Sequence, residues 1–267
     1  MTTKQFGAPV QRLEDPRLVS GNGRYLDDLG QGALAAAFVR SPFAHARIVD
    51  IDVTDVLDVE GVVAVYTHDD LAADTSCSVG ERLPLLIPHP ALTHPMTGYA
   101  LAPGVVKHVG EPVAMVVAVD RYVAEDAVAR IQVSYEQLPV VVGVETSRAA
   151  AHLVHEEAPG NVSAHLVQEV GDARAAVAAA PHKLSLDLHI DRSASMPMEG
   201  KGVLAQWNPD EGMLRIYSST QTSTGVRAAV AAKLALPLAK VECIAPDVGG
   251  GFGAKIMHPW PEEVLVP

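Results

Sequence analysis

Several residue types are scarce in this sequence, and each scarcity excludes a class of protein. Cys77 and Cys243 are the only cysteines among 267 residues, too few to hold an iron–sulfur cluster or a structural zinc ion. We expect both to be unpaired thiols in a reducing compartment. Basic residues number 20 against 32 acidic ones, and the resulting charge of -12 disfavours nucleic acid or an anionic membrane as a partner.

Long apolar runs are also missing. No run approaches the roughly 20 residues that are needed to cross a bilayer, and the polar N-terminus has no apolar signal-peptide segment. We therefore predict a cytoplasmic protein that is not inserted into a membrane. Aromatic residues make up only 4% of the chain, whereas it has 19 prolines and 21 glycines. Proline and glycine interrupt helices and strands, so their number favours many short elements over a helical bundle. The chain is long enough for about two domains.

Hydrophobic periodicity predicts an α/β fold. The expected strands lie at 33–40, 47–53, 61–66, 112–119, 131–135, 184–190, 203–206, 213–218 and 240–245, and the expected helices at 121–130, 171–180 and 224–234. Residues 112–135 form one predicted strand–helix–strand unit. The strand at 184–190 is indicated by strict alternation of apolar and polar residues, and the five prolines of 72–104 indicate a long irregular loop.

The most unusual segment is 245–255 (APDVGGGFGAK), with four glycines in five positions. Glycine permits positive φ and close approach of a ligand to backbone amides. Gly249, Gly251 and Ala254 imitate a dinucleotide-binding pattern, but prolines follow where that pattern requires a helix, and no acidic residue follows about 20 residues later. A phosphate-binding loop would need a glycine before Lys255 and a hydroxyl residue after it. On local pattern alone, a tight packing turn is an equal alternative.

Two further polar segments precede this loop. Gln221 follows a predicted strand and offers both a donor and an acceptor. On pattern alone, however, we favour a helix-capping region with a neighbouring Ser or Thr as the N-cap. Glu199, in 195–200 (SMPMEG), is either a buried acid or a solvated loop carboxylate, and we favour the latter. The eleven histidines show no metal-ligand spacing, and no nucleophile–base pair is apparent.

Eight motifs, in order along nearly the whole chain, resemble the large, molybdopterin-binding subunit of molybdenum hydroxylases, the family of xanthine dehydrogenase, aldehyde oxidase and aerobic carbon monoxide dehydrogenase. They are 12–18 (RLEDPRL), 21–28 (GNGRYLDD), 38–46 (FVRSPFAHA), 109–114 (VGEPVA), 133–139 (VSYEQLP), 197–199 (PME), 219–221 (STQ) and 249–253 (GGGFG). Each motif is weak by itself, whereas their common order is specific.

The resemblance implies a domain order. An N-terminal arm at 1–19 would precede an α/β hammerhead domain at 20–137. A linker at 138–165 would lead to the N-terminal part of a molybdopterin cofactor-binding domain at 166–267. The resemblance covers about a third of the family's large subunit, and the chain is expected to end within a helix that continues elsewhere.

The resemblance also implies cofactor-binding residues. By their match to the family's motifs, Gln221, Gly250, Gly251, Phe252 and Gly253 would bind molybdopterin, and Gln221 and Phe252 would lie near the molybdenum, through its oxo ligand or through backbone contacts. Backbone amides of a glycine loop suit such ligands because no side chain obstructs them. No catalytic residue is expected here, because the family's general-base glutamate lies far downstream.

The same resemblance predicts partners and a reaction. The chain would be one part of a split large subunit, inactive alone, with a second molybdopterin-binding chain, a [2Fe–2S] subunit and an FAD subunit in one complex. It would hydroxylate a small molecule with water as the oxygen source, using the cytosine dinucleotide form of molybdopterin. Ile256 stands where purine-oxidising relatives carry glutamate, which argues against a purine. Residues 255–267 resemble bacterial enzymes that act on N-heteroaromatic or similar small molecules, which favours a substrate of that class. An aldehyde- or carbon monoxide-oxidising member, or a truncated non-catalytic assembly subunit, is the alternative.

Overall fold

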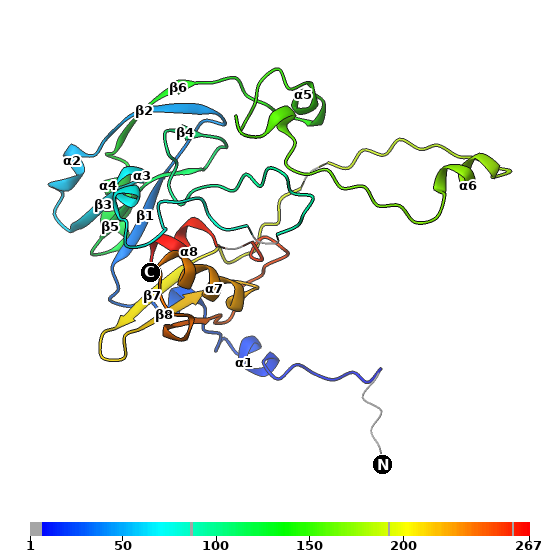
Figure 1. Ribbon diagram of the computed structural model, residues 1–267. Helices are drawn as coiled ribbons and strands as arrows, with labels where there is room; N and C mark the ends of the chain where they lie inside the picture. The colour runs from blue at the N-terminus through cyan, green and yellow to red at the C-terminus, as the bar shows by residue number, and fades with distance from the viewer. Residues whose placement is uncertain (1–6, 86–87, 192, 258) are drawn as a thin grey trace, which may run out of the picture.

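The computed structural model describes residues 7–85, 88–191, 193–257 and 259–267. Residues 1–6 of the predicted N-terminal arm therefore lie outside the described residues. The described chain contains short helices and strands in mixed order, with two three-stranded sheets in its first half and one in its second (Figure 1). The α/β fold class predicted from periodicity is confirmed.

The first half of the chain builds two antiparallel sheets. One has the order β1-β5-β3 and the other β4-β2-β6. The strands are β1 (Ala35–Arg40), β2 (Ala46–Asp52), β3 (Val62–Thr67), β4 (Val105–Val106), β5 (Pro112–Ala118) and β6 (Gln132–Gln137). The helices are α1 (Asp15–Val19), α2 (Thr54–Leu57), α3 (His68–Ala73), α4 (Arg121–Val128) and α5 (Val144–Ala149), with 3₁₀ turns at Leu26–Asp28 and Pro159–Asn161. Apolar residues of β5, α2 and α4 form one core cluster with Ile131.

The expected strand–helix–strand unit at 112–135 forms, but its two strands belong to different sheets. Strand β5 is apolar and almost wholly buried, so it takes the central place between β1 and β3. Strand β6 is only half-buried and pairs with β2 at the edge of the second sheet. The predicted unit is therefore confirmed in its elements, and its strands lie in different sheets because each strand's burial calls for a different number of neighbours.

The second half packs α7 against a three-stranded sheet of order β7-β8-β9, and α8 contacts α7. Its elements are β7 (Val203–Asn208), β8 (Met213–Ser218), α7 (Ser223–Lys233), a 3₁₀ turn (Leu238–Lys240), β9 (Val241–Ile244) and α8 (Pro261–Leu265). Strand β8 pairs antiparallel with β7 and parallel with β9. Leu214 and Ile216 of β8 pack with Val226 and Val230 of α7 to form its core.

A long arm leaves this body between 166 and 191, with α6 (Ala173–Ala179) near its tip (Figure 1). The strand predicted at 184–190 does not form here, since these residues have no strand partner among those described. Their apolar side chains are exposed instead, Leu184 by 86% and Ile190 by 88%. The residues do alternate between apolar and polar, as the prediction assumed. A strand also requires a neighbouring strand to pair with, and none of the described segments supplies one.

The two halves contact each other through buried polar groups. Lys233, at the end of α7, donates from Nζ to the carbonyls of Ser78 (2.7 Å) and Glu81 (3.1 Å). Burial lowers the pKa of this lysine, with Glu81 opposing the shift. In the part of the chain that the structure describes, no helix has the length and apolar character to cross a membrane.

Candidate functional site

The glycine loop and Gln221 meet because the strands before them run side by side. Strands β8 and β9 are parallel, with Leu214 opposite Val241 and Tyr217 opposite Ile244. Gln221 lies three residues after β8, and the loop at 249–253 follows β9. Carboxyl ends of parallel strands meet at one edge of a sheet, where ligand sites of α/β folds gather. Two segments about 30 residues apart are thus brought into contact.

Gln221 contacts the loop directly. The backbone N–H of Gly253 donates to Gln221 Oε1 at 3.1 Å, and the backbone N–H of Gln221 donates to the Lys255 carbonyl at 3.1 Å. Gln221 Oε1 is therefore occupied, which leaves the side-chain amide nitrogen of Gln221 to donate to another group. Among the described residues this nitrogen has no hydrogen-bond acceptor. Thr222 holds the N-cap position of α7 without a side-chain cap bond, so the helix-cap interpretation does not account for Gln221.

The loop is tightly packed at Gly249 and Gly251, where a side chain would clash. A Cβ atom on Gly251 would lie 2.6 Å from Gln221 Oε1, and one on Gly249 would lie 2.5 Å from the Glu199 Cβ. Gly250 has a φ of 100° and Phe252, unusually for a residue with a side chain, a φ of 49°. Such strain persists where the surroundings impose it, often at functional sites. The Phe252 carbonyl accepts from Ser195 Oγ at 2.9 Å, while its ring is 76% exposed.

Three consecutive loop amides have no acceptor. Within the described residues, the backbone N–H groups of Gly250, Gly251 and Phe252 make no hydrogen bond, although those of Gly249 and Gly253 do. These residues are partly exposed, so water can accept from their amides. Successive amides with glycine geometry can also form an anion-binding concavity. The arrangement is therefore compatible with a ligand site as well as with the packing turn that local pattern left as an equal alternative.

Glu199 joins the two ends of the loop. Its Oε2 accepts from the Gly249 backbone N–H at 2.8 Å and from Lys255 Nζ at 2.9 Å. The lysine side chain is 1% exposed and the glutamate side chain 18%. The solvated loop carboxylate that we favoured from sequence is therefore wrong, because the buried lysine needs a counter-charge. Glu199 Oε1 is buried and has no partner among the described residues, so an acceptor is left open beside the loop.

A second buried ion pair of reversed polarity lies next to the first. Lys201 Nζ is 3.0 Å from Glu263 Oε1, with side-chain exposures of 6% and 0%. Glu263 also accepts from Ser218 Oγ at 2.7 Å and from the Trp260 backbone N–H at 2.8 Å. Burial lowers the pKa of Lys201, and Glu263 opposes the shift. The two pairs tie residues 199–201 to the segment that runs from the glycine loop to α8.

We expect Lys255→Met to destabilise the protein strongly. The substitution keeps an apolar chain of similar length but leaves the Glu199 carboxylate without its charge partner. Breaking a buried pair in this way costs about 3 kcal/mol in the free energy of unfolding, measurable by denaturant titration. Arg47→Met is the control, because its ion pair with Glu136 is exposed, by 57% and 63%, and is worth less than about 1 kcal/mol. Equal losses in the two variants would contradict the structural role of Lys255.

Asp247 ties the entrance of the loop to the N-terminal segment. It accepts from both guanidinium nitrogens of Arg17 in α1 and, at 2.7 Å, from the backbone N–H of Arg24. The hydrogen bond from Arg17, followed by that from Arg24, lowers the pKa of the Asp247 carboxyl far below its ordinary 3.8. The motifs at 12–18 and 21–28 are thus bound directly to the segment that leads into the glycines.

Acidification should therefore weaken the interaction of Asp247 with Arg17 and Arg24. A carboxyl whose folded pKa is depressed stabilises the folded state at every pH above its unfolded pKa, and this contribution is lost as the pH falls through the folded pKa. The melting temperature of the wild type should exceed that of Asp247→Asn by a constant amount from pH 7 to about pH 4 and approach it on further acidification. A difference that does not change with pH would rule out the ionised Asp247 as its source.

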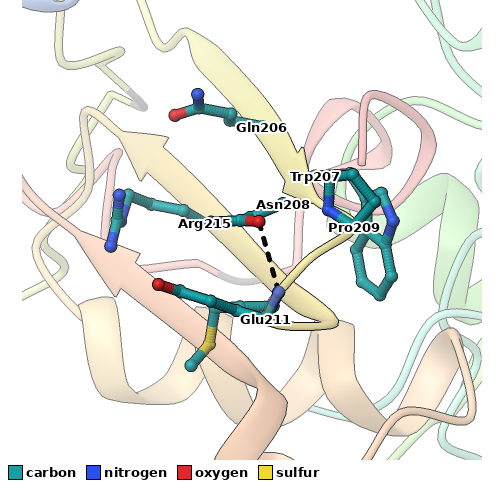
Figure 2. A pocket seen from close by; sticks show the side chains of 7 residues that line it. Gln206, Trp207, Asn208, Pro209, Glu211 and Arg215 are labelled. Carbon is teal, nitrogen blue, oxygen red and sulfur yellow. Dashed lines mark hydrogen bonds between the residues drawn. The ribbon is translucent and has the colours of Figure 1, made fainter.

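A hollow on the β7–β8 hairpin is not part of this site. It is lined by Gln206, Trp207, Asn208, Pro209, Glu211, Met213 and Arg215 (Figure 2). Asn208 Oδ1 accepts from the Glu211 backbone N–H at 3.3 Å and closes the turn there. Because Gln221 follows the opposite end of β8, the hollow lies away from the glycine loop.

No protein-ligated metal centre is apparent. Among the described residues, no group of three or more His, Cys, Asp or Glu side chains could hold a metal ion. Cys77 and Cys243 are both free thiols, as expected, and burial raises the pKa of Cys243 to about 11.

Sequence reasoning found Gln221 and the loop glycines but missed Lys255, Lys201 and Glu263. Each is a charged residue in a segment of unremarkable pattern, and no local signal separates a buried lysine from a solvated one. In the first segment glutamate (Glu199) precedes lysine (Lys201), whereas in the second lysine (Lys255) precedes glutamate (Glu263). Only this reversed order could have suggested that the charges pair.

Two family models match consecutive parts of the chain. The aldehyde oxidase and xanthine dehydrogenase a/b hammerhead domain matches residues 20–139, and the molybdopterin cofactor-binding domain matches residues 154–267. The glycine loop, Gln221 and both buried ion pairs lie within the second match. The matched order is the one that the eight motifs predicted.

Named relatives agree with these models. The chain is 38% identical over its whole length to the nicotine 6-hydroxylase large subunit of Paenarthrobacter nicotinovorans, of which it covers 32%. It is 33% identical over 91% of its length to the carbon monoxide dehydrogenase large chain of Hydrogenophaga pseudoflava, of which it covers 31%. Quinoline 2-oxidoreductase from Pseudomonas putida 86 superposes with a TM-score of 0.80 at 36% identity, covering 96% of this chain and 32% of that one. The chain thus spans about one third of the length of these relatives.

Proposed function

Because the chain belongs to the molybdenum hydroxylase family of aldehyde oxidase and xanthine dehydrogenase, we propose that it forms one wall of a molybdopterin site. The residues in this role are Gln221, Gly250, Gly251, Phe252 and Gly253. The observation that carries the proposal is the row of three unpaired loop amides beside the open amide nitrogen of Gln221.

These residues fit such a cofactor. Oxo and phosphate oxygens of a molybdenum cofactor are acceptors, and the wall offers donors from three loop amides and one side-chain amide. Gln221 occupies the space on one side of Gly251. The other side of the Gly251 backbone can face a ligand. The buried, unpartnered Glu199 Oε1 offers an acceptor for a donor on the ligand or for a bound water. When bound, the cofactor would supply the redox chemistry that places an oxygen from water on the substrate carbon.

This chain's residues orient rather than transfer protons in the proposed reaction. Gln221 is fixed by the Gly253 N–H so that its nitrogen donates, and the ion pair of Glu199 with Lys255 holds both ends of the loop. Preorganised donors of this kind stabilise charge without moving during the reaction. The general-base glutamate would come from the two thirds of the large subunit that the sequence does not span.

The substrate we propose is a small N-heteroaromatic compound. Two observations support it: the relatives named as nicotine 6-hydroxylase and quinoline 2-oxidoreductase, and the apolar Ile256, 42% exposed, next to the loop. The relatives named carbon monoxide dehydrogenase support an alternative. Turnover by the native enzyme of quinoline or nicotine, but not of carbon monoxide or an aldehyde, would decide between them.

We further propose a complex with iron–sulfur and FAD subunits and with the remaining part of the molybdopterin-binding subunit, in which the pterin carries a cytosine nucleotide. The two cysteines of this chain cannot supply the clusters, so electrons would leave through another chain. The test is to purify the native assembly and measure molybdenum, iron, flavin and the polypeptides in it. About one molybdenum per copy of this chain is expected. A stable, metal-free protein would favour a non-catalytic assembly role instead.

A further inference from the structure

Two of the family motifs have no part in the site described above. Residues 38–46 (FVRSPFAHA) and 109–114 (VGEPVA) lie in the half of the chain that matches the hammerhead domain model, the hammerhead half. The structure joins them: the backbone N–H of Ser41 donates to the Glu111 carbonyl at 2.9 Å, and that of Gly110 donates to the Ser41 carbonyl at 2.8 Å. The two motifs thus form one hydrogen-bonded corner at the end of β1.

Arg40 connects this corner to the second half of the chain. Its Nη1 donates to the Gly110 carbonyl at 3.1 Å, and its Nη2 donates to Oε1 of Glu262 in α8, the helix that contacts α7 (Figure 1). The first bond orients the guanidinium, and the second crosses between the halves. The other carboxylate oxygen, Glu262 Oε2, is buried and has no partner among the described residues. Arg40 therefore supplies the bond that holds this carboxylate.

The next residue of α8 binds the strand that leads to the proposed site. Glu263 accepts from Ser218 Oγ at 2.7 Å, and its Oε1 is 3.0 Å from Lys201 Nζ. Ser218 is the last residue of β8 and lies three positions before Gln221. Two successive glutamates of one short helix therefore bind opposite halves of the chain, Glu262 the corner of the hammerhead half and Glu263 the end of β8.

We propose that Arg40 and Glu262 are positioning residues for Gln221 and the glycine loop, so that the hammerhead half sets the geometry of the proposed molybdopterin site. Arg40 holds α8, α8 holds the end of β8 through Glu263, and the end of β8 places Gln221 against the loop. Both residues act through α8 and not by contact with cofactor or substrate. The expected effect on turnover rests on the function proposed above, whereas the coupling is a property of this chain alone.

A contribution to stability alone is the competing explanation, and the exposure of the pair argues against it. The Arg40 side chain is 43% exposed and that of Glu262 18%, so water screens the pair and it stabilises the folded state little. Its main effect is directional, because a guanidinium that is already bound to a carbonyl receives the carboxylate in one orientation. Loss of the pair should therefore displace α8 without unfolding the chain.

Arg40→Met in the native assembly tests the coupling. The backbone N–H groups of Gln221, Gly249 and Gly253 are hydrogen-bonded within the site, so their exchange with solvent reports local opening there. Exchange of these three amides should be about 10-fold faster in the variant than in the wild type. The kcat should fall about 10-fold or more with KM unchanged, because the donors are displaced while substrate binding is kept.

Arg121→Met is the matched control. It removes the same charge from the same half of the chain, where Arg121 forms an exposed pair with Glu125 in α4, and it should change neither exchange nor kcat. Glu262→Gln breaks the proposed pair from its other side and keeps the shape of the side chain. If Arg40 and Glu262 act as one unit, the double variant Arg40→Met with Glu262→Gln is no more impaired than either single variant. Values for Arg40→Met that match the control, or additive effects of the two single variants, would overturn the proposal.

The same measurements separate this inference from the proposed function. Faster exchange of the three amides in Arg40→Met, in a native assembly that contains no molybdenum, would uphold the coupling and remove the proposed function. Unchanged exchange in an assembly that contains molybdenum would overturn the coupling and leave the proposed function in place.

Discussion

Replacing Gln221 by alanine should lower kcat by about 100-fold or more, the effect of removing one preorganised donor from a reaction centre. The Gly253 N–H fixes the amide oxygen, so the nitrogen is the group that the variant removes from the site. Molybdenum content and assembly should stay near the wild-type level, because the loop keeps its other anchors at Glu199, Ser195 and Lys255. Steady-state kinetics with metal analysis of the same sample is the measurement.

Gln206→Ala is the matched control for that variant. Gln206 lies on β7 at the hairpin hollow (Figure 2), in the same half of the chain but away from the loop. It should leave kcat and metal content unchanged. If Gln221→Ala turned over as fast as this control, Gln221 would be removed from the site.

Gly251→Ala should cost both cofactor and activity. The new Cβ would lie 2.6 Å from Oε1, 2.7 Å from Cδ and 2.8 Å from Cγ of Gln221, so either the loop or the glutamine must shift. A displacement of about 1 Å in a reaction centre lowers the rate by about 100-fold. Molybdenum per chain should fall as well, because the shifted amides no longer share one ligand. This combined loss distinguishes the variant from Gln221→Ala.

Gly200→Ala provides the control for the glycine substitution. A Cβ atom on Gly200 meets nothing within 4 Å, although the residue adjoins Glu199. The same added methyl group should therefore leave molybdenum and kcat at wild-type values. Full molybdenum content in Gly251→Ala would show that the loop does not carry the cofactor.

Periodicity located most strands and the helices α4, α6 and α7 because their signals are local, but it did not mark α1, α2, α5 or β4. Strand β5 is a continuous apolar run, α4 has a helical spacing, and β8 and α7 flank a polar segment as expected. The pairing of β5 and β6 was not available from the same signals. Whether two successive strands share a sheet depends on how many neighbours each can bury, a property of the whole domain.

Some features of the proposed site could be predicted from the sequence and others could not. Motif order pointed to Gln221 and to the glycines, since close backbone approach requires glycine wherever it occurs. The sequence could not show that Glu199 is buried against Lys255, because charged residues in loops are solvated by default. It also could not show which loop amides are left open, since that depends on contacts from residues about 30 to 50 positions away.

By itself, then, the sequence determined most of the strands and the longer helices, the order of the two family domains and the presence of a glycine loop after a strand. Only the tertiary structure decided that β8 and β9 run parallel, which brings Gln221 onto the loop, and that two buried ion pairs of opposite polarity tie residues 199–201 to the segment after the loop. It also left the apolar strand at 184–190 without a neighbour. The physical reason is common to all three: backbone propensity is encoded within a few residues, whereas burial, pairing and the satisfaction of polar groups are decided by segments distant in sequence.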